Sequence, residues 1–255
     1  MAGALIYIGC LLTLLLLSTA SFSQVDISKK WDISKTWDGA QVYVPGNWFT
    51  KAVNTVEVTQ PMPVVIFMHG CGSIDQDTRQ WAGFLKDNGY IVLLPDSYAM
   101  PDRVRNCDPR TSTTNLGKVP VNDLRPAEAD YAMSKIKAVS WVDKSNIFLM
   151  GHSEGGMAAY LTPEVGFKGI IISGFVCSIR GGVRAKSDTP VLALNWERDP
   201  WFVKPNQEYK TCADTPLWQK RSQAVEVILP GQGHSTVSEQ AARDSVIKFL
   251  KRNID

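Results

Sequence analysis

Short continuous runs of β-branched and other apolar residues recur along the chain, and segments with helical spacing separate most of them. The runs are VVIFM at 64–68, IVLL at 91–94, NIFLM at 146–150, GIIIS at 169–173 and PVLAL at 190–194. Such runs are typical of strands buried on both faces of a parallel sheet. Strands that alternate with helices predict one open, mostly parallel sheet flanked by helices on both faces. The expected fold class is therefore α/β.

The helical segments and the remaining strands complete this pattern. Helical spacing is clearest over Gln76–Asn88, where Trp81, Phe84 and Leu85 recur at i, i+3 and i+4. Further helices are expected over Leu124–Val139, Met157–Leu161 and Ser238–Leu250 and around Leu217–Trp218, and further strands over Ala40–Val44 and Val225–Leu229. In such a sheet, functional residues are expected beyond the carboxyl ends of the strands.

The first 23 residues contain no charged side chain and predict a signal peptide. An apolar run from Ala4 to Leu17 is followed by small residues, which fits export better than a spanning helix. Because no Lys or Arg precedes the run, an uncleaved membrane anchor is the alternative. Residues 24–255 are expected to form a single domain, secreted or periplasmic and without stable membrane association. The short duplication DISKKW–DISKTW at its start predicts an N-terminal extension or edge segment.

Charge and cysteine spacing exclude several classes of function. The chain has 27 basic and 25 acidic residues among 255, without a block of like charge, so no nucleic-acid partner is expected. Signal cleavage would remove Cys10 and leave an even number of cysteines, which favours disulfides in an exported protein. The sequence has no C-x-x-C spacing, and no metal or cofactor is implied. The oligomeric state stays open.

The stretch GHSEGG at residues 151–156 follows the NIFLM run and precedes a helical pattern. A sharp strand-to-helix turn needs small residues around it, and here it would expose the Ser153 hydroxyl at the edge of the sheet. Ser153 is therefore the predicted nucleophile. The alternative is an ordinary serine that caps the helix, with glycines that serve only packing.

A serine nucleophile needs a base, and the base needs an acid. The chain has three histidines, and His69 and His152 belong to other local motifs, so His234 in LPGQGHSTV is the predicted base. The loop NWERDPWF offers Glu197 and Asp199 as the acid. Asp199 is preferred because it lies farther past the preceding strand. The order Ser153, Asp199, His234 is that of α/β-hydrolases.

An acyl-transfer site also needs N–H donors for the oxyanion. The backbone N–H of Glu154, directly after the nucleophile, is one candidate. The second is expected from the loop MHGCGS after the VVIFM run, where the position after His-Gly is Cys71. The neighbouring Gly70 and Gly72 would let this backbone come close to a substrate.

The segments VVIFMHGCGS, MGHSEGG, NWERDPW and GHS resemble the dienelactone hydrolase-related branch of the α/β-hydrolase superfamily, over about residues 40–250. The resemblance implies the α/β-hydrolase fold and a small-molecule, ester-type substrate. Dienelactone hydrolases carry a cysteine nucleophile, whereas this chain has Ser153, which favours esterase or peptidase-like chemistry over a lactone substrate. The resemblance also suggests the disulfides Cys71–Cys107 and Cys177–Cys212, although sequence alone allows three pairings of four cysteines.

Two further groups of side chains lie in loops at the functional end. The aromatic residues Tyr98, Trp196, Trp201 and Phe202 could form an apolar pocket, and Arg103, Arg105 and Arg180 could hold a carboxylate. The function predicted is cleavage of an ester, or alternatively a thioester or amide, through an acyl-enzyme. The rivals are another chemistry on the same scaffold (a carbon–carbon bond hydrolase, acyltransferase, lyase or peptidase) and a non-catalytic binding module.

Overall fold

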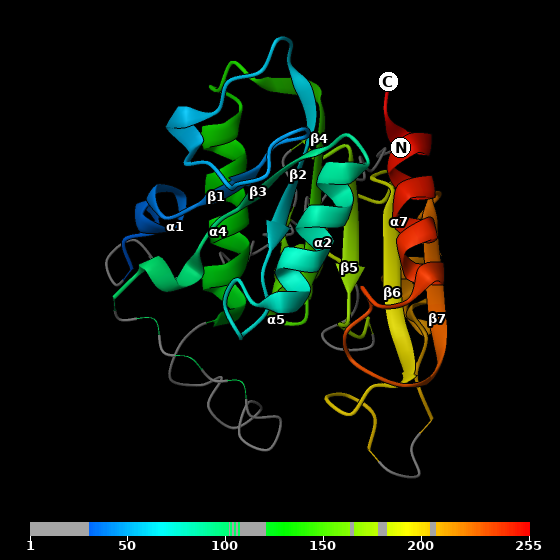
Figure 1. Ribbon diagram of the computed structural model, residues 1–255. Coiled ribbons are helices and arrows are strands. Elements are labelled where there is room, and N and C mark those ends of the chain that lie inside the picture. The colour runs from blue at the N-terminus through cyan, green and yellow to red at the C-terminus, as the bar shows by residue number, and fades with distance from the viewer. Residues whose placement is uncertain are drawn as a thin grey trace, which may run out of the picture.

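One seven-stranded sheet forms the centre of the molecule (Figure 1). The computed structural model describes residues 31–101, 103, 105, 107, 121–163, 166–177, 183–204 and 208–255. The strands are β1 (Gln41–Tyr43), β2 (Met62–Met68), β3 (Ile91–Leu94), β4 (Val142–His152), β5 (Gly169–Ser173), β6 (Val191–Arg198) and β7 (Ala224–Gln232). Their order is β1-β3-β2-β4-β5-β6-β7, and every neighbouring pair except β1–β3 is parallel. The predicted mostly parallel α/β fold is confirmed.

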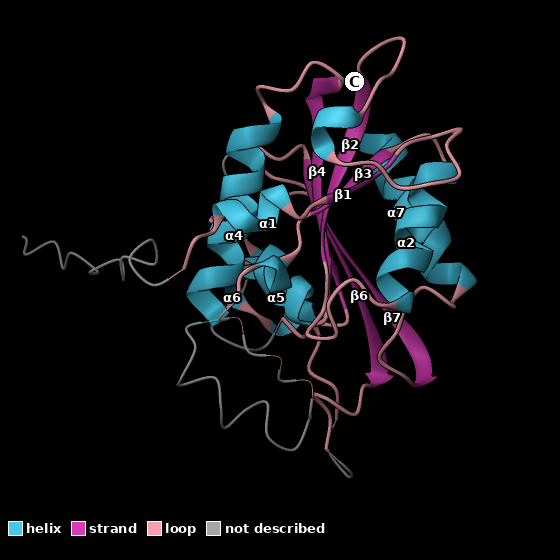
Figure 2. Ribbon diagram, turned by 60° about the vertical axis from the view of Figure 1, so that its left-hand side comes forward, coloured by secondary structure: helices cyan, strands magenta, loops and turns pink. Residues whose placement is uncertain are grey.

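Helices cover both faces of this sheet (Figure 2). On one face lie α1 (Ser34–Asp38), α4 (Val121–Ile136), α5 (Glu154–Leu161) and α6 (Pro216–Gln219), and on the other lie α2 (Gln76–Asp87) and α7 (Gln240–Asn253). Short 3₁₀ turns occur at η2 (Val53–Thr55), η3 (Ser97–Ala99) and η4 (Cys212–Asp214). This sandwich of helix, sheet and helix is the layering that the alternating sequence pattern predicts.

Two apolar cores, one on each face, explain why the strands read as continuous runs. In β2, Ile66 and Met68 pack with α4 and α5, whereas Val65 and Phe67 pack with α2 and α7. Successive side chains of a strand point to opposite faces, so a strand covered on both sides needs an apolar residue at every position.

The structure extends two of the predicted strands and adds one helix. β4 begins at Val142, before the NIFLM run, and β6 continues past PVLAL to Arg198 because it stays paired with β7 as far as Gln232. The second copy of the duplication forms the short helix α1, whose Thr36 is buried and accepts a hydrogen bond from the Asp96 N–H. This copy is therefore packed against the domain, where the sequence suggested only an extension or edge segment.

Both suggested disulfides are confirmed. Cys71 is bonded to Cys107 with a Cα–Cα distance of 5.3 Å, and Cys177 is bonded to Cys212 at 4.7 Å. The predicted signal peptide, residues 1–23, lies outside the described part of the chain. Among the residues that are described, no helix has both the length and the apolarity needed to cross a bilayer.

Candidate active site

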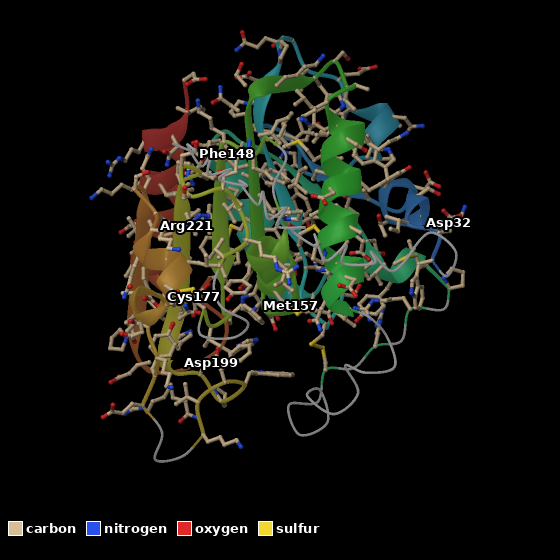
Figure 3. The ribbon with its side chains drawn as sticks, turned by 180° about the vertical axis from the view of Figure 1, so that it is seen from behind. Asp32, Phe148, Met157, Cys177, Asp199 and Arg221 are labelled. Carbon is tan, nitrogen blue, oxygen red and sulfur yellow. A yellow bond between two sulfur atoms is a disulfide. The ribbon has the colours of Figure 1, made fainter. Side chains whose placement is uncertain are left out.

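The three residues predicted to react lie at the carboxyl edge of the sheet. Ser153 directly follows β4, Asp199 directly follows β6, and His234 comes shortly after β7. In Figure 3, Asp199 and Met157 of α5 lie toward the lower end of the molecule, whereas Phe148, within β4, lies in the upper half. The chain reverses its direction of strand addition at β2, between β3 and β4, which is where open α/β sheets bind ligands.

Ser153 lies on a strained turn. Its φ of 57° and ψ of −117° are outside the usual regions for a residue with a side chain, and its hydroxyl makes no capping bond to α5. A Cβ at Gly155 would lie 1.8 Å from the Met68 carbonyl oxygen, and one at Gly151 would lie 2.0 Å from the Gly155 carbonyl oxygen. Only glycine lets the backbone fold back this closely. Of the two interpretations of this serine, the geometry matches the strained turn and not the helix cap.

A chain of two hydrogen bonds joins the three side chains. His234 Nε2 lies 2.9 Å from Ser153 Oγ, and His234 Nδ1 lies 2.7 Å from Asp199 Oδ2. Asp199 is buried, and its Oδ1 accepts the Trp201 backbone N–H at 2.9 Å. The other acid considered, Glu197, is exposed and accepts instead the Gly231 N–H. A carboxylate at Nδ1 leaves Nε2 free to accept the serine proton.

Aromatic side chains surround the imidazole. The Trp201 ring stacks on His234 with centroids 5.3 Å apart, and Phe202 lies at 6.1 Å. Trp196 donates through Nε1 to the Ser235 carbonyl, and so supports the loop that carries His234. Of the four aromatic residues singled out in the sequence, two therefore contact the base and a third supports its loop.

His152 lies close to the site but is held away from the hydroxyl. Its Nδ1 lies 3.0 Å from Ser173 Oγ, which in turn lies 2.7 Å from Thr236 Oγ1. Burial, and secondarily the neighbouring His234, lower the pKa of His152 to about 3. His152 is thus neutral at physiological pH, and its Nδ1 is hydrogen-bonded to the Ser173 hydroxyl. The imidazole that is hydrogen-bonded to the Ser153 hydroxyl is that of His234.

The loop after β2 lies against the nucleophile. A Cβ at Gly70 would be 3.4 Å from Ser153 Cβ. The Cys71 carbonyl accepts the Tyr98 hydroxyl at 2.8 Å. Within the described residues, neither the Cys71 N–H nor the Glu154 N–H has a hydrogen-bond acceptor. Both predicted oxyanion donors are thus backbone groups beside Ser153 that a reacting oxygen could use.

The arginines do not all lie where a substrate carboxylate would need them. Arg103 is buried and pairs with the Glu154 carboxylate. Arg105 is exposed, with its guanidinium 4.8 Å from the centre of the Tyr98 ring. Arg180 lies outside the described residues. The expected carboxylate site therefore loses Arg103 to an internal partner.

Sequence reasoning missed a buried polar cluster behind this loop. Arg125 and Glu128, both fully buried on α4, form an ion pair, and the Ser97 hydroxyl donates to Glu128 at 2.6 Å. The available signal was an Arg and a Glu spaced i, i+3 beside Leu124 and Ala129 in the helix predicted over Leu124–Val139. Charges on an apolar helix face require partners, because an unpaired buried charge is very costly.

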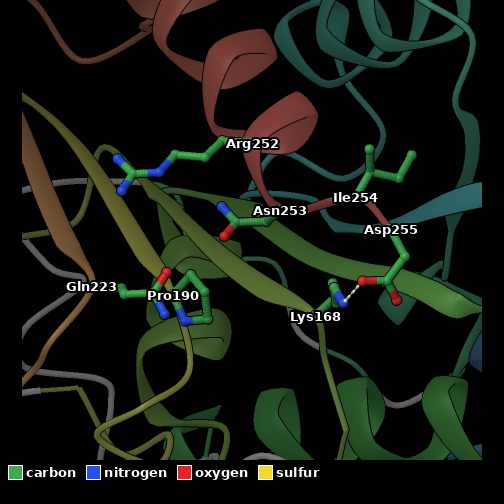
Figure 4. A pocket seen from close by; sticks show the side chains of 7 residues that line it. All are labelled: Lys168, Pro190, Gln223, Arg252, Asn253, Ile254 and Asp255. Carbon is green, nitrogen blue, oxygen red and sulfur yellow. Dashed lines mark hydrogen bonds and ion pairs between the residues drawn. The ribbon is translucent and has the colours of Figure 1, made fainter.

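A separate surface pocket of about 340 Å³ lies at the opposite edge of the sheet (Figure 4). Lys168, Pro190 and Gln223, each just before a parallel strand, line it together with the C-terminal residues, and Lys168 pairs with Asp255. It contains none of the predicted site residues. Across the described residues, no group of three or more His, Cys, Asp or Glu side chains is arranged to hold a metal ion.

Several solved structures share this fold at low sequence identity. The esterase PE8 aligns with a TM-score of 0.55 and 19% identity over 76% of this chain and 94% of its own. A dienelactone hydrolase-like promiscuous phosphotriesterase from metagenomic libraries aligns at 0.58 and 14% over 78% and 89%. Est1E from Butyrivibrio proteoclasticus aligns at 0.54 and 14% over 84% and 93%. Comparison with curated proteins finds no match.

The family is shown by the sequence itself. The dienelactone hydrolase family matches residues 51–249, which is most of the chain and includes every predicted site residue. That span runs from the segment before β2 into α7, so it contains the parallel part of the sheet. The chain therefore belongs to the dienelactone hydrolase family, a family of ester-bond hydrolases within the α/β-hydrolase superfamily.

Proposed function

We propose that this protein is a serine hydrolase that cleaves a carboxylic ester of a small molecule. The observation that carries the proposal is the hydrogen-bonded series Ser153–His234–Asp199, at 2.9 and 2.7 Å, with the serine at positive φ. A helix-capping serine needs neither the strained backbone nor an imidazole on its hydroxyl. A binding module needs no buried carboxylate behind that imidazole.

The proposed reaction passes through an acyl-enzyme. Ser153 Oγ attacks the ester carbonyl while His234 Nε2 takes its proton, and Asp199 stabilises the resulting imidazolium. The carbonyl oxygen becomes an anion that accepts hydrogen bonds from the backbone N–H groups of Cys71 and Glu154. Collapse of this intermediate transfers the proton to the leaving alkoxide. Water then attacks the acyl carbon while His234 takes one of its protons. His234 passes this proton to Ser153 Oγ as the bond between the acyl carbon and Oγ breaks, and the carboxylic acid is released.

The experiment that tests the proposal is labelling with a fluorophosphonate probe, which reacts with an activated serine. The wild-type protein is expected to label, and Ser153→Ala is expected to lose the label completely. Ser238→Ala is the matched control, since Ser238 is exposed and its hydroxyl donates to the neighbouring Glu239 carboxylate. A wild-type protein that neither labels nor hydrolyses any short p-nitrophenyl ester would contradict the proposal. Lactone, thioester, peptide and phosphotriester substrates in the same screen separate the rival chemistries.

We also propose that the protein is exported. The support is the uncharged, apolar N-terminal run together with two disulfides, a combination typical of oxidising compartments. N-terminal sequencing of the protein expressed in a secreting bacterial host checks this. A mature chain that begins near residue 24 is the expected result. An intact Met1 on protein confined to the cytosolic fraction would contradict export.

A further inference from the structure

We propose that Arg125 is a positioning residue, whose single buried guanidinium holds together the two loops that carry the oxyanion donors. The inference rests on the proposed function, because it assigns a role within the same site. Arg125 belongs to α4, and its hydrogen bonds and ion pairs with the described residues are to His69, Glu128 and Glu154, not to Ser153 or His234. Its effect on the reaction would therefore be exerted through the backbone that it holds.

One guanidinium reaches both loops. Arg125 Nη2 donates to the His69 carbonyl, in the loop after β2. Arg125 Nε lies 3.3 Å from the Glu154 carboxylate, on the residue after the nucleophile, which is an ion-pair contact without hydrogen-bond geometry. The third nitrogen, Nη1, pairs with Glu128, which fixes the guanidinium on its own helix. The two loops belong to different strands, and Arg125 contacts both at once.

The same loop is held at its next peptide as well. The Ser97 N–H donates to His69 Nε2 at 3.0 Å, so the ring proton must be on Nδ1, which donates to the Gly70 carbonyl at 2.7 Å. Burial, and next the charge of Arg125, hold the pKa of His69 well below its ordinary value, so the ring stays neutral. This arrangement fixes the tautomer of His69 and the direction in which it donates.

These bonds determine where the Cys71 N–H points. The Gly70 carbonyl and the Cys71 N–H belong to one planar peptide unit, and none of the described peptides is cis. In a trans unit the two groups point in opposite directions. Holding the carbonyl on the buried side therefore directs the N–H to the other side of the loop. Arg125 holds the preceding carbonyl, of His69, and so prevents the loop from turning about this peptide.

Charge gives a second reason for an arginine at this place. The Glu154 carboxylate lies on the residue whose N–H is to stabilise an oxyanion, and an unpaired anion there would oppose the developing charge. Arg103 and Arg125 both pair with it. Burial alone would lower the pKa of Arg125, but Glu128 and then Glu154 raise it above its ordinary value. Arg125 therefore remains charged and offsets the repulsion between the Glu154 carboxylate and the oxyanion, which little water can screen at this place.

The test compares Arg125→Met and Arg125→Lys with the wild type in ester hydrolysis. Loss of aligned oxyanion donors should lower kcat by about 10²–10³-fold in Arg125→Met, with KM within about threefold. Arg125→Lys keeps the charge but cannot reach both loops, so its kcat should recover only in part. A phenylboronic acid, which forms a tetrahedral adduct on the serine, should lose affinity in parallel with kcat/KM in each variant.

The matched control is Arg221→Met. Arg221 is half-buried and also holds backbone carbonyls, those of Ala185 and Lys186, but it lies in the segment before β7, away from Ser153 and His234. Its removal should lower the melting temperature without changing kcat or boronate affinity.

Two results would overturn the inference. One is an Arg125→Met variant whose kcat lies within about threefold of wild type. The other is a loss of kcat without a parallel loss of boronate affinity. If Arg125→Met does not fold, Arg125→Lys decides, and unchanged kcat there also overturns it. Failure of the proposed function looks different, because the wild type would then hydrolyse no ester, or Ser153→Ala would keep the wild-type activity.

Discussion

Replacing Ser153 or His234 with alanine should lower kcat for ester hydrolysis by about 10⁵–10⁶-fold. The reason is that the two side chains act as a unit. The hydroxyl is a weak nucleophile without a base, and the base has no nucleophile to activate in this reaction once the serine is removed. His234 Nε2 lies 2.9 Å from Ser153 Oγ, so the proton can move without rearrangement. Residual hydrolysis would come from binding and from the oxyanion donors alone.

The double variant gives the sharper measurement. If the two residues act in the same catalytic step, the kcat of the double variant Ser153→Ala/His234→Ala should be no lower than that of the slower single variant. Steady-state kinetics with a p-nitrophenyl ester measures this, and Ser238→Ala is the control for surface serine loss. Multiplicative losses in the double variant would mean that the two residues act separately. Near-wild-type activity of either single variant would remove that residue from the mechanism.

Asp199→Asn should lower kcat by about 10⁴-fold while leaving the fold intact. Asp199 Oδ1 accepts the Trp201 N–H, so in the variant the amide oxygen must keep that place and the amide NH₂ must face His234. An NH₂ donates where the carboxylate accepts. It therefore stabilises the imidazole with its proton on Nε2, and that tautomer cannot accept the proton of Ser153.

The neighbouring acid supplies the control for this prediction. Glu197 is exposed and accepts the Gly231 N–H, so Glu197→Gln should change kcat by less than about threefold. Kinetics and melting temperatures of both variants are the measurements. Equal losses in the two variants would show that Asp199 has no special role as the acid.

Much of the fold follows from local pattern. The β5 strand coincides with its predicted range, and α2 differs only by one residue at its end, because apolar periodicity and a glycine after the helix are local signals. The length of a strand depends also on its neighbour in the sheet. β6 extends past PVLAL because β7 lies beside it and stays paired with it. The short helix α1 was missed, since its burial depends on contact with the segment at Asp96.

The candidate site divides in the same way. Ser153, Asp199 and His234 could be selected from motif, chain order and the small number of histidines, without knowledge of any distance. The choice of Asp199 over Glu197 was a preference until the fold placed one carboxylate at 2.7 Å from the imidazole and the other at Gly231. Arg103 was expected to face a substrate, and the fold turns it to Glu154.

Periodicity, glycine placement and chain order are properties of the chain, so the order of strands and helices, the family and the candidate reactive residues could all be predicted before any distance was known. Which groups meet depends on the folded structure. Arg125 and Glu128 on α4 reach His69 and Glu154 because packing brings α4 beneath the loops after β2 and β4. Contacts between residues this far apart in the chain depend on the packing of whole elements, and no local pattern encodes them.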